Sequence, residues 1–324
     1  MPLVEPLAFQ PSYQRLVWGG RRMQRYRADL PEGPIGESWD LADHEKGMSR
    51  VRSGEHAGRT LRELMERYPD ELVGPGFRGQ LFPLMIKLID ASDTLSVQVH
   101  PDDELARELG VGDNGKTECW FMLEDGGTLY QGTRPGVDRG VFEAALAGGR
   151  VAETLNQFAI ERGDFFFLDA RTVHALGSGC LLYEIQQTSD VTFRVYDWGR
   201  VGLDGKPRPL HVEQSLATID FSRGGFGALR PAWQPDRRGG ETRRLADCRY
   251  FEVEQRRTRG EPLEAGSQER CSVVICSEGR ARIVTQTAEL ELAAMTTALV
   301  PAAAGSFRIL PEPSTGVLVA TPRF

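Results

Sequence analysis

The stretch at residues 95–103, Leu-Ser-Val-Gln-Val-His-Pro-Asp-Asp, constrains the fold more than any other part of the chain. Its valines alternate with polar residues, which is typical of a β-strand with one apolar and one polar face. Gln98 and His100 therefore point to the same side, and Pro101 with the two aspartates ends the strand in a turn. An amide oxygen beside an imidazole on a rigid strand is half of a metal site. A solvent-facing strand edge would show the same pattern, so the rest of the chain must decide between the two interpretations.

The remaining sequence has the character of a turn-rich β protein. Its 324 residues can bury a sizeable core in one large or two medium domains. The 36 glycines and 19 prolines favour short strands over a helical bundle. Strand patterns lie at residues 35–41, 82–90, 116–123, 128–130, 165–168, 172–176, 181–187 and 191–197. Helical patterns lie at residues 61–68, with Thr60 as N-cap, and at 102–109, 137–146 and 209–219.

The net charge and the cysteine content indicate which partners to expect and in which cellular compartment the protein works. The net charge of −7 argues against nucleic acid as a main partner and still permits a local basic pocket for a phosphate. Five cysteines form no C-x-x-C pair and follow no signal peptide, so we expect reduced thiols in the cytoplasm. No apolar run is long enough to span a bilayer, so no membrane partner is expected. The oligomeric state stays open.

The last third of the sequence predicts a second, smaller β unit. Residues 222–245 are rich in Gly, Arg and Pro and are interpreted as a connector. Short alternating strands follow at 250–253, 272–275, 281–284, 297–300 and 316–320, with the spacing of a barrel or sandwich. None of the five histidines lies there, so a histidine-based metal site is excluded and a structural or lid role is favoured. The expected domains are 1–225, catalytic with helical insertions, and 226–324, without metal ligands.

Candidate metal ligands lie in three separate strand contexts. Gln98 and His100 share the first, Glu118 lies in the second and His174 in the third. Zinc and its first-row neighbours accept mixed nitrogen and oxygen ligands, and three or four protein ligands with an open position mark a catalytic site. Each residue alone has a simpler explanation, such as a hydrogen-bonded core histidine or a surface glutamate. Arg194 could likewise form a structural pair. Taken together, the four candidate ligands and Arg194 are polar residues within otherwise apolar strands, at positions where the inside of a small barrel is expected.

Longer motifs give the chain a family resemblance. Gly163 lies eleven residues before His174, a spacing that resembles the second motif of the cupin superfamily. The segments SVQVHPD (96–102), GKTECW (115–120), GDFF (163–166), HA (174–175), YEIQQTSD (183–190) and FRVYD (193–197) resemble the type I mannose-6-phosphate isomerases, most closely the shorter bacterial form. WGG (18–20) and GESW (36–39) also match, so the resemblance covers residues 8–220 in order.

This resemblance implies a mainly β chain with two cupin-like, jelly-roll barrels and helical insertions in the N-terminal part. It implies a zinc-dependent aldose–ketose isomerase that interconverts mannose 6-phosphate and fructose 6-phosphate and binds one zinc ion. By position, the family's metal ligands fall on Gln98, His100, Glu118 and His174. Its active-site arginine falls on Arg194, and polar pocket residues fall on Trp18, Lys87, Ser96, Lys116 and Glu184.

One position departs from the family pattern. The long forms carry Asn-His-Lys-Pro-Glu where this chain has Asn-Gly-Lys-Thr-Glu at 114–118. A role of that histidine, for instance in opening the sugar ring, cannot be carried over to Gly115.

The expected reaction moves a proton between C1 and C2 through a cis-enediol. Arg194 is expected to stabilise the enediolate charge, because a guanidinium stays protonated. Glu184 is the expected base, because a carboxylate in a dry pocket can have its pKa raised. Lys116 is expected to act beside them, and Lys87, Ser96 and Trp18 to bind substrate. Two alternatives remain open: another cupin enzyme such as an iron oxygenase, and a sugar-phosphate sensor without catalysis.

Overall fold

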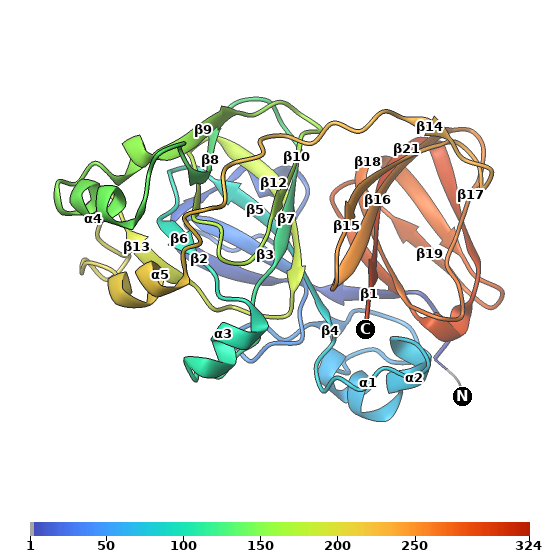
Figure 1. Cartoon of the computed structure of the whole chain (residues 1–324). Helices are drawn as coiled ribbons and strands as arrows, with labels where there is room; N and C mark the ends of the chain where they lie inside the picture. Colours follow the sequence, from blue (N-terminus) through green and yellow to red (C-terminus); the bar gives the residue numbers. More distant parts are fainter. Residues whose placement is uncertain (1–2) are drawn as a thin grey trace. The chain divides into compact units, whose positions relative to one another are not determined.

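The computed structural model describes residues 3–324 and consists mainly of antiparallel β-structure (Figure 1). The first strands are β1 Leu7–Gln10, β2 Ser12–Gly20, β3 Ile35–Leu41, β4 Arg50–Val51, β5 Leu84–Ala91, β6 Val97–Val99 and β7 Glu118–Met122. The middle strands are β8 Thr128–Thr133, β9 Leu155–Ala159, β10 Phe165–Leu168, β11 His174–Leu176, β12 Cys180–Gln187 and β13 Phe193–Tyr196. The last strands are β14 Gln234–Pro235, β15 Glu241–Asp247, β16 Phe251–Arg259, β17 Leu263–Ala265, β18 Ser272–Val284, β19 Glu289–Leu292, β20 Thr297–Val300 and β21 Phe307–Pro322.

Helices are short and lie between the strands. The α-helices are α1 Leu61–Arg67, α2 Pro69–Leu72, α3 Asp103–Glu108, α4 Arg139–Ala147 and α5 Val212–Thr218. Three 3₁₀ turns accompany them, η1 Arg22–Arg25, η2 Val151–Thr154 and η3 Ala302–Ala304. No helix within residues 3–324 combines the length and the apolar character that a membrane span requires.

Two compact units share the chain. The central unit contains Tyr13–Ser38 and Lys87–Leu229, and the C-terminal unit contains Trp39–Ile86, Arg230–Phe324 and the residues up to Ser12. This division differs from the expected one, because residues 39–86 belong with the end of the chain. Strand β1 explains part of the difference, since it pairs with β20 and β4. Such long-range pairings leave no local sequence signal.

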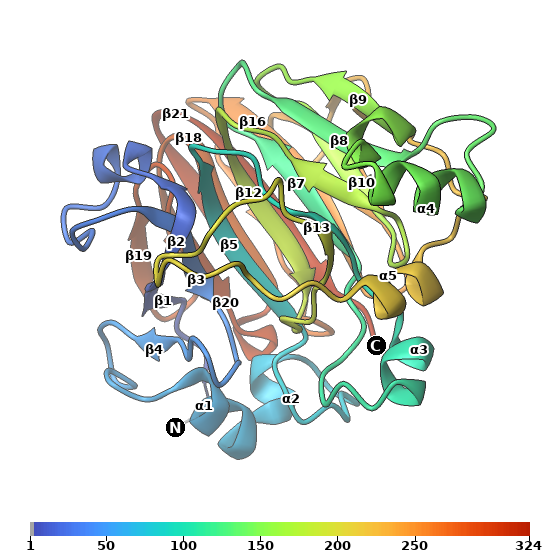
Figure 2. The same cartoon turned by 90° about the vertical axis from the view of Figure 1, so that its left-hand side faces the viewer.

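Two antiparallel sheets carry the residues singled out above. The six-stranded sheet has the order β10-β7-β12-β5-β2-β3, and the five-stranded sheet has the order β13-β6-β11-β8-β9. Figures 1 and 2 show β7 and β12 side by side, and five residue pairs join them in register. In the five-stranded sheet, Gln98 pairs with His174 on one side and with Arg194 on the other. Residues opposite one another on paired strands share a face, so sheet register brings three of the predicted site residues into one row.

The ten-stranded sheet belongs to the C-terminal unit and corrects two expectations. Its central order is β14-β15-β16-β21-β18-β20-β1-β4. The predicted connector at 222–245 is wrong in its last part, because β14 and the start of β15 lie there. The separate strands predicted at 272–275 and 281–284 are one strand, β18, whose register against β21 shifts between Cys276 and Ala281. A bulge of this kind interrupts the apolar pattern without ending the strand.

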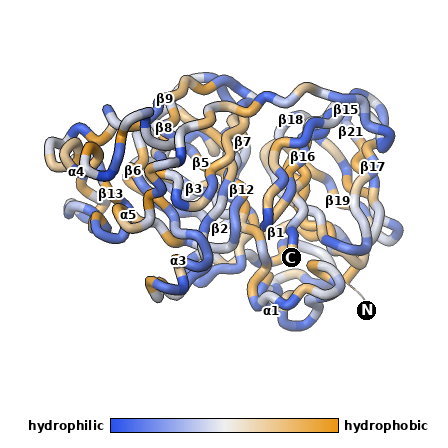
Figure 3. Tube along the Cα trace, in the orientation of Figure 1, coloured by the Kyte–Doolittle hydropathy of each residue, from blue (hydrophilic) through white to orange (hydrophobic). Residues whose placement is uncertain are grey.

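Hydrophobic side chains form the buried clusters of the protein, and Figure 3 shows hydrophobic residues concentrated along the strands. Val97 and Val99 pack in one cluster with Phe142 and Val195. Their strand therefore turns its valines into the core and its polar side chains to the other face, as the alternation predicts. Such burial contributes roughly 25 cal/mol per Å² of apolar surface.

Local sequence signals fixed most helix ends. Thr60 caps α1 and forms a reciprocal capping box with Glu63, and Asp102 caps α3 through the backbone N–H of Leu105. Helix α5 is shorter than the predicted 209–219. The backbone groups before α5 bond to Arg194 and not within the helix. The Pro209 carbonyl accepts a hydrogen bond from the Arg194 side chain, and the His211 N–H donates to the Arg194 carbonyl.

Replacement of Thr60 by alanine removes the side-chain half of the capping box. We expect Thr60→Ala to lower the free energy of unfolding by about 1 kcal/mol, measured as a lower urea midpoint. Glu66→Ala changes an exposed residue of the same helix outside the cap and should shift the midpoint much less. Equal shifts in the two variants would show that the capping box contributes no specific stability.

Candidate metal centre and active site

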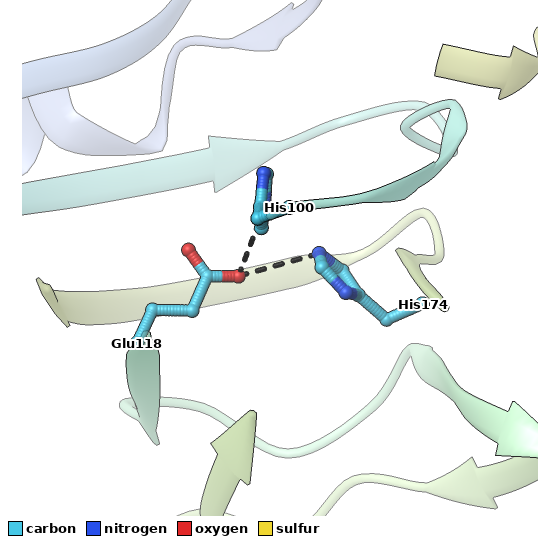
Figure 4. Close-up of side chains that lie close together, drawn as sticks. All are labelled: His100, Glu118 and His174. Atoms are coloured by element: carbon cyan, nitrogen blue, oxygen red, sulfur yellow. Dashed lines mark ion pairs between the residues drawn. The ribbon is translucent and has the colours of Figure 1, made fainter. Parts of the chain in front are cut away.

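Two histidines and a glutamate converge at one buried point (Figure 4). Oε1 of Glu118 lies 3.3 Å from Nε2 of His174 and 3.6 Å from Nε2 of His100. One ligand atom from each residue lies within 4.8 Å of the other two. All three side chains are at most 2% exposed. The structure thus brings together three of the four predicted metal ligands.

Each of the three residues is positioned by the end of a strand. Glu118 begins β7, His174 begins β11, and His100 directly follows β6. Strand ends combine a rigid backbone with open space beyond the sheet, which suits a site for a ligand. The three strands come from two different sheets, so the cluster depends on tertiary structure.

Backbone carbonyls orient both imidazole rings. Nδ1 of His100 donates to the Val191 carbonyl at 2.7 Å, and Nδ1 of His174 donates to the Thr172 carbonyl at 2.8 Å. Because each Nδ1 carries the proton, each Nε2 presents a lone pair to Glu118. Burial lowers the pKa of both histidines, with help from the Lys116 ammonium, and that of His100 falls to about 3. Both rings are therefore neutral at physiological pH.

Glu118 is a buried anion. Burial raises the pKa of this carboxyl, but the Lys116 ammonium and the two imidazoles outweigh burial and hold the pKa well below its usual range. Nζ of Lys116 lies 2.6 Å from Oε2 of Glu118. Oε1 faces the two Nε2 atoms and accepts no hydrogen bond from any described residue. No proton lies between Oε1 of Glu118 and the two Nε2 atoms, and a divalent cation bound by these three atoms would satisfy them.

Gln98 lies at the edge of this cluster. Its Nε2 is 3.3 Å from Nε2 of His174, and its Oε1 is 3.4 Å from the Ser96 hydroxyl. In this orientation the amide donates to the imidazole lone pair. A ligand role for Gln98 would require the amide to turn over, so its place among the ligands stays a prediction.

A row of alternating charges continues from Glu118 along the six-stranded sheet. Oε1 of Glu184 lies 3.3 Å from Nζ of Lys87 and 3.7 Å from Nζ of Lys116, and Lys87 also lies 3.6 Å from Glu37. Oε2 of Glu184 accepts a hydrogen bond of 2.8 Å from the Trp120 indole. Burial, followed by the charge of Glu118, raises the pKa of Glu184 despite the two ammonium groups. Glu184 therefore has the environment of a group that can take up a proton.

Lys87 keeps its charge in this row. Burial alone would lower the pKa of Lys87, but Glu37 and Glu184 more than offset it, so the pKa lies above its usual value. The ammonium is 3% exposed and thus links the two carboxylates inside the protein.

Arg194 lies on β13 of the five-stranded sheet, in register with Gln98. Its guanidinium donates to the Pro209 carbonyl at 2.9 Å, in place of the structural ion pair considered from the sequence. Nε of Arg194 is buried and makes no hydrogen bond with any described residue. Burial and then the Arg208 and Arg200 charges lower the pKa of Arg194. A partly desolvated guanidinium with an unused donor is suited to an anionic ligand.

Ser96 and Trp18, the remaining predicted substrate-binding residues, lie in different surroundings. Ser96 is 3% exposed and contacts Gln98, so it lies beside the cluster. Trp18 is 4% exposed and packs in an apolar cluster that also contains Trp120 and Ile89. Trp18 lies near the end of β2, with its side chain in the core.

Gly115 has a steric reason to be glycine. A Cβ atom at this position would lie 2.3 Å from the backbone nitrogen of Asp103 and 2.4 Å from the carbonyl carbon of Asp102. A histidine therefore does not fit the local backbone, so any role of the long forms' histidine is absent at position 115.

Sequence reasoning assigned no role to Glu37 or Trp120. Trp120 lies two residues after Glu118 on β7, so strand periodicity places it on the same face and could have indicated it. Glu37 lies in the GESW motif, but no local signal shows that it meets Lys87, because the two residues are on different strands.

Removal of the Lys87 charge should destabilise the protein. Lys87→Met leaves Glu37 and Glu184 without their shared ammonium, and we expect a loss of about 3 kcal/mol in the free energy of unfolding. The double variant Lys87→Met/Glu184→Gln removes one of the stranded carboxylates and should recover much of that loss. Urea unfolding of both variants measures the coupling between Lys87 and Glu184. Equal losses of unfolding free energy in the single and the double variant would contradict this coupling.

Comparisons with known proteins identify the family of this chain. A family model described as phosphomannose isomerase type I, catalytic domain, matches residues 7–118. Mannose-6-phosphate isomerase ManA of Bacillus subtilis (strain 168) is 38% identical over 219 residues, which cover 67% of this chain and 68% of that protein. The crystal structure of the mannose 6-phosphate isomerase from Bacillus subtilis superposes with a TM-score of 0.89 at 28% identity, covering 98% of this chain and 99% of the other.

A further solved structure, a mannose 6-phosphate isomerase bound with zinc and yttrium, has a TM-score of 0.76 at 18% identity and covers 99% of this chain and all of its own. At that identity the likeness supports the fold alone. These matches confirm the mainly β, cupin fold class, whereas the division into two barrels stays a prediction. Because more than a third of the residues are identical over two thirds of both chains, the chain belongs to the type I phosphomannose isomerase family.

Proposed function

We propose that this protein interconverts mannose 6-phosphate and fructose 6-phosphate as a zinc-dependent isomerase, through a cis-enediol. The observation that carries the proposal is the buried arrangement of Glu118 with two neutral histidines, beside a row of charged groups that can handle protons and anions. The family of the chain and the names of its relatives point to the same reaction.

Zinc fits the residues present. His100, Glu118 and His174 would hold one ion, since two neutral imidazoles and a carboxylate form a ligand set that leaves a position open for substrate. Gln98 would complete the set after its amide turns over. The backbone hydrogen bonds of both Nδ1 atoms are the outer partners that such histidines require. When bound, zinc supplies Lewis acidity that polarises the sugar carbonyl.

Glu184 would move the proton between C2 and C1. Its raised pKa favours uptake of a proton from carbon, and the Trp120 indole fixes Oε2, so Oε1, which has ion-pair contacts but accepts no hydrogen bond from the described residues, is the oxygen for this role. Return of the same proton to C1, together with passage of the hydroxyl proton from O2 to O1, completes the conversion of the aldose to the ketose. Lys116 lies between Glu184 and Glu118 and would stabilise the charge that develops on the enediolate oxygens.

Arg194, Lys87, Ser96 and Trp18 would hold the substrate. The unused Nε–H of Arg194 is suited to a negatively charged oxygen of the enediolate. The Lys87 ammonium lies between Glu37 and Glu184, so its contact with substrate would be to a hydroxyl beside the base. Ser96 offers a hydroxyl beside Gln98, and Trp18 would shape the apolar wall through its packing with Trp120.

We also place the protein in the cytoplasm, with hexose 6-phosphate as its partner. All five cysteines are free thiols, which agrees with a reducing compartment. The net charge of −7 disfavours nucleic acid as a partner.

Metal removal tests the proposed cofactor. We expect conversion of mannose 6-phosphate to stop after chelation and to return with added zinc, because the substrate carbonyl then regains its electrophile. His174→Ala should weaken zinc binding by more than about 100-fold, the upper end for an outer partner. His211→Ala, which changes a histidine whose ring accepts a hydrogen bond from the Arg194 backbone N–H and which is not among the predicted ligands, should retain its zinc.

Other outcomes of this experiment identify the alternatives. Tight binding of mannose 6-phosphate by the zinc-loaded protein without turnover would replace the isomerase with a sensor. Activity that requires iron and oxygen would replace it with a cupin oxygenase. Unchanged zinc content in His174→Ala would overturn the assignment of the metal ligands.

Replacement of Arg194 tests charge stabilisation separately from metal binding. Arg194→Ala should lower kcat by about 100- to 1000-fold, the usual effect of losing one charge-stabilising donor, while zinc content stays unchanged. Arg139→Ala changes an arginine paired with Glu143 on the exposed helix α4 and should leave kcat unchanged. Full activity of Arg194→Ala would remove this residue from the mechanism.

A further inference from the structure

A polar cavity lies in the C-terminal unit, on the ten-stranded sheet. Its volume is about 170 Å³, and its walls come from β16, β17, β18 and β21 with the loops at 236–240 and 266–270. The strands are labelled in Figure 1. Glu252 pairs in register with Thr321, and Glu254 pairs with Val319. Val319 belongs to the apolar cluster of this sheet, so the cavity adjoins the hydrophobic core.

Arg256 is the most unusual residue of this cavity. Its side chain is 1% exposed, although most arginines of the chain reach solvent. One terminal nitrogen lies 3.0 Å from Asp236, and the other donates to the Glu264 carbonyl at 2.6 Å. Nε is buried and makes no hydrogen bond within residues 3–324. A buried N–H without a partner is costly, and a ligand that reached this atom would remove that cost.

Further donors line the same space. Arg270 forms no ion pair with the described part of the chain, and its only hydrogen bond there is a long one, 3.5 Å, to the Pro322 carbonyl. Ser272 and Thr321, two residues with hydroxyl groups, also line the cavity. Hydroxyl and guanidinium groups together are typical of sites that bind oxyanions.

The acidic residues of the cavity are already paired. Glu252 lies 3.0 Å from Arg323, and Glu254 lies 3.0 Å from Arg238 and 3.8 Å from Arg244. Asp236 is shared by Arg238 and Arg256. Once these pairs are formed, Arg270 and the Nε–H of Arg256 remain as the unmatched groups. Their unmatched donors favour a negatively charged ligand.

We propose that this cavity is a second ligand site, which binds a small oxyanion of the phosphate-monoester or carboxylate class. Arg256 and Arg270 hold the anionic oxygens, and the Ser272 and Thr321 hydroxyls donate further hydrogen bonds. The site lies entirely within the C-terminal unit. It does not depend on the proposed isomerase activity, and it gives this unit a binding role in place of the purely structural or lid role expected from the sequence.

The test follows the Nε–H signal of Arg256 by NMR in the full chain with ¹⁵N-labelled arginine. Loss of one signal in Arg256→Lys identifies it. Inorganic phosphate and, in a separate titration, malonate are added at constant ionic strength. We expect a saturable shift of the signal with at least one probe, and comparison of the two decides between phosphate and carboxylate. Absence of a saturable shift with both probes overturns the proposal.

Variants locate the binding without disturbing the buried arginine. Arg270→Gln should weaken binding about tenfold, as expected for one charge-assisted contact, and Thr321→Val should weaken it less. Arg259→Gln changes an exposed arginine on the opposite face of β16 and should leave the affinity unchanged. Calorimetric titration of these variants gives the affinities independently of the Arg256 signal, and equal affinity in Arg270→Gln contradicts the proposal.

A last variant separates this site from the active site. Arg194→Ala alters the candidate active site in the central unit, and we expect the Arg256 signal to respond to phosphate there as in the unchanged protein. A response lost in Arg194→Ala would show that the anion acts from the active site, and would overturn a second site. Loss of isomerase activity alone would leave the proposal intact.

Discussion

The candidate active site depends on one electrostatic constraint, the burial of the Glu118 carboxylate among two neutral imidazoles. Each histidine has its Nδ1 proton directed to a backbone carbonyl, so neither ring can donate to Glu118. An unpaired buried carboxylate would cost several kcal/mol. The Lys116 ammonium is the positive charge that the protein itself supplies, and the ligand geometry leaves room for a second, divalent one.

That constraint extends to the neighbouring charges. Lys116 faces both Glu118 and Glu184, and Lys87 faces Glu184 and Glu37. Each buried charge thus has an opposite charge beside it, so a change at one end of the row alters the protonation of the others. This coupling explains how one pocket can contain an ionised carboxylate, Glu118, and a carboxylate of raised pKa, Glu184. Two carboxylates of different basicity are what a proton transfer beside a metal requires.

The C-terminal unit also contains a buried charged group with an unmatched polar atom, but the group is of a different chemical kind. It has no histidine among its sheet residues from 230 onward, and its buried polar group is a guanidinium, Arg256, not a carboxylate. At the candidate metal centre the unmatched atoms are the carboxylate oxygens of Glu118, which favour a cation. In the C-terminal unit the unmatched atoms are N–H donors and favour an anion. The same fold class can therefore present sites of opposite preference, because each site is set by a few side chains on the strands.

The sequence by itself predicted many of the strands, the N-cap of α1, and the three residues His100, Glu118 and His174 that the structure brings together. Alternation at 95–100 placed Gln98 and His100 on one face, and the capping pattern placed α1, because these signals act over a few residues. Only the tertiary structure decided that residues 39–86 join the C-terminal unit, that Glu37 meets Lys87, and that Gln98 turns its amide nitrogen to His174. Those outcomes depend on strand register and on burial of charge between distant segments, and neither leaves a periodic trace in the sequence.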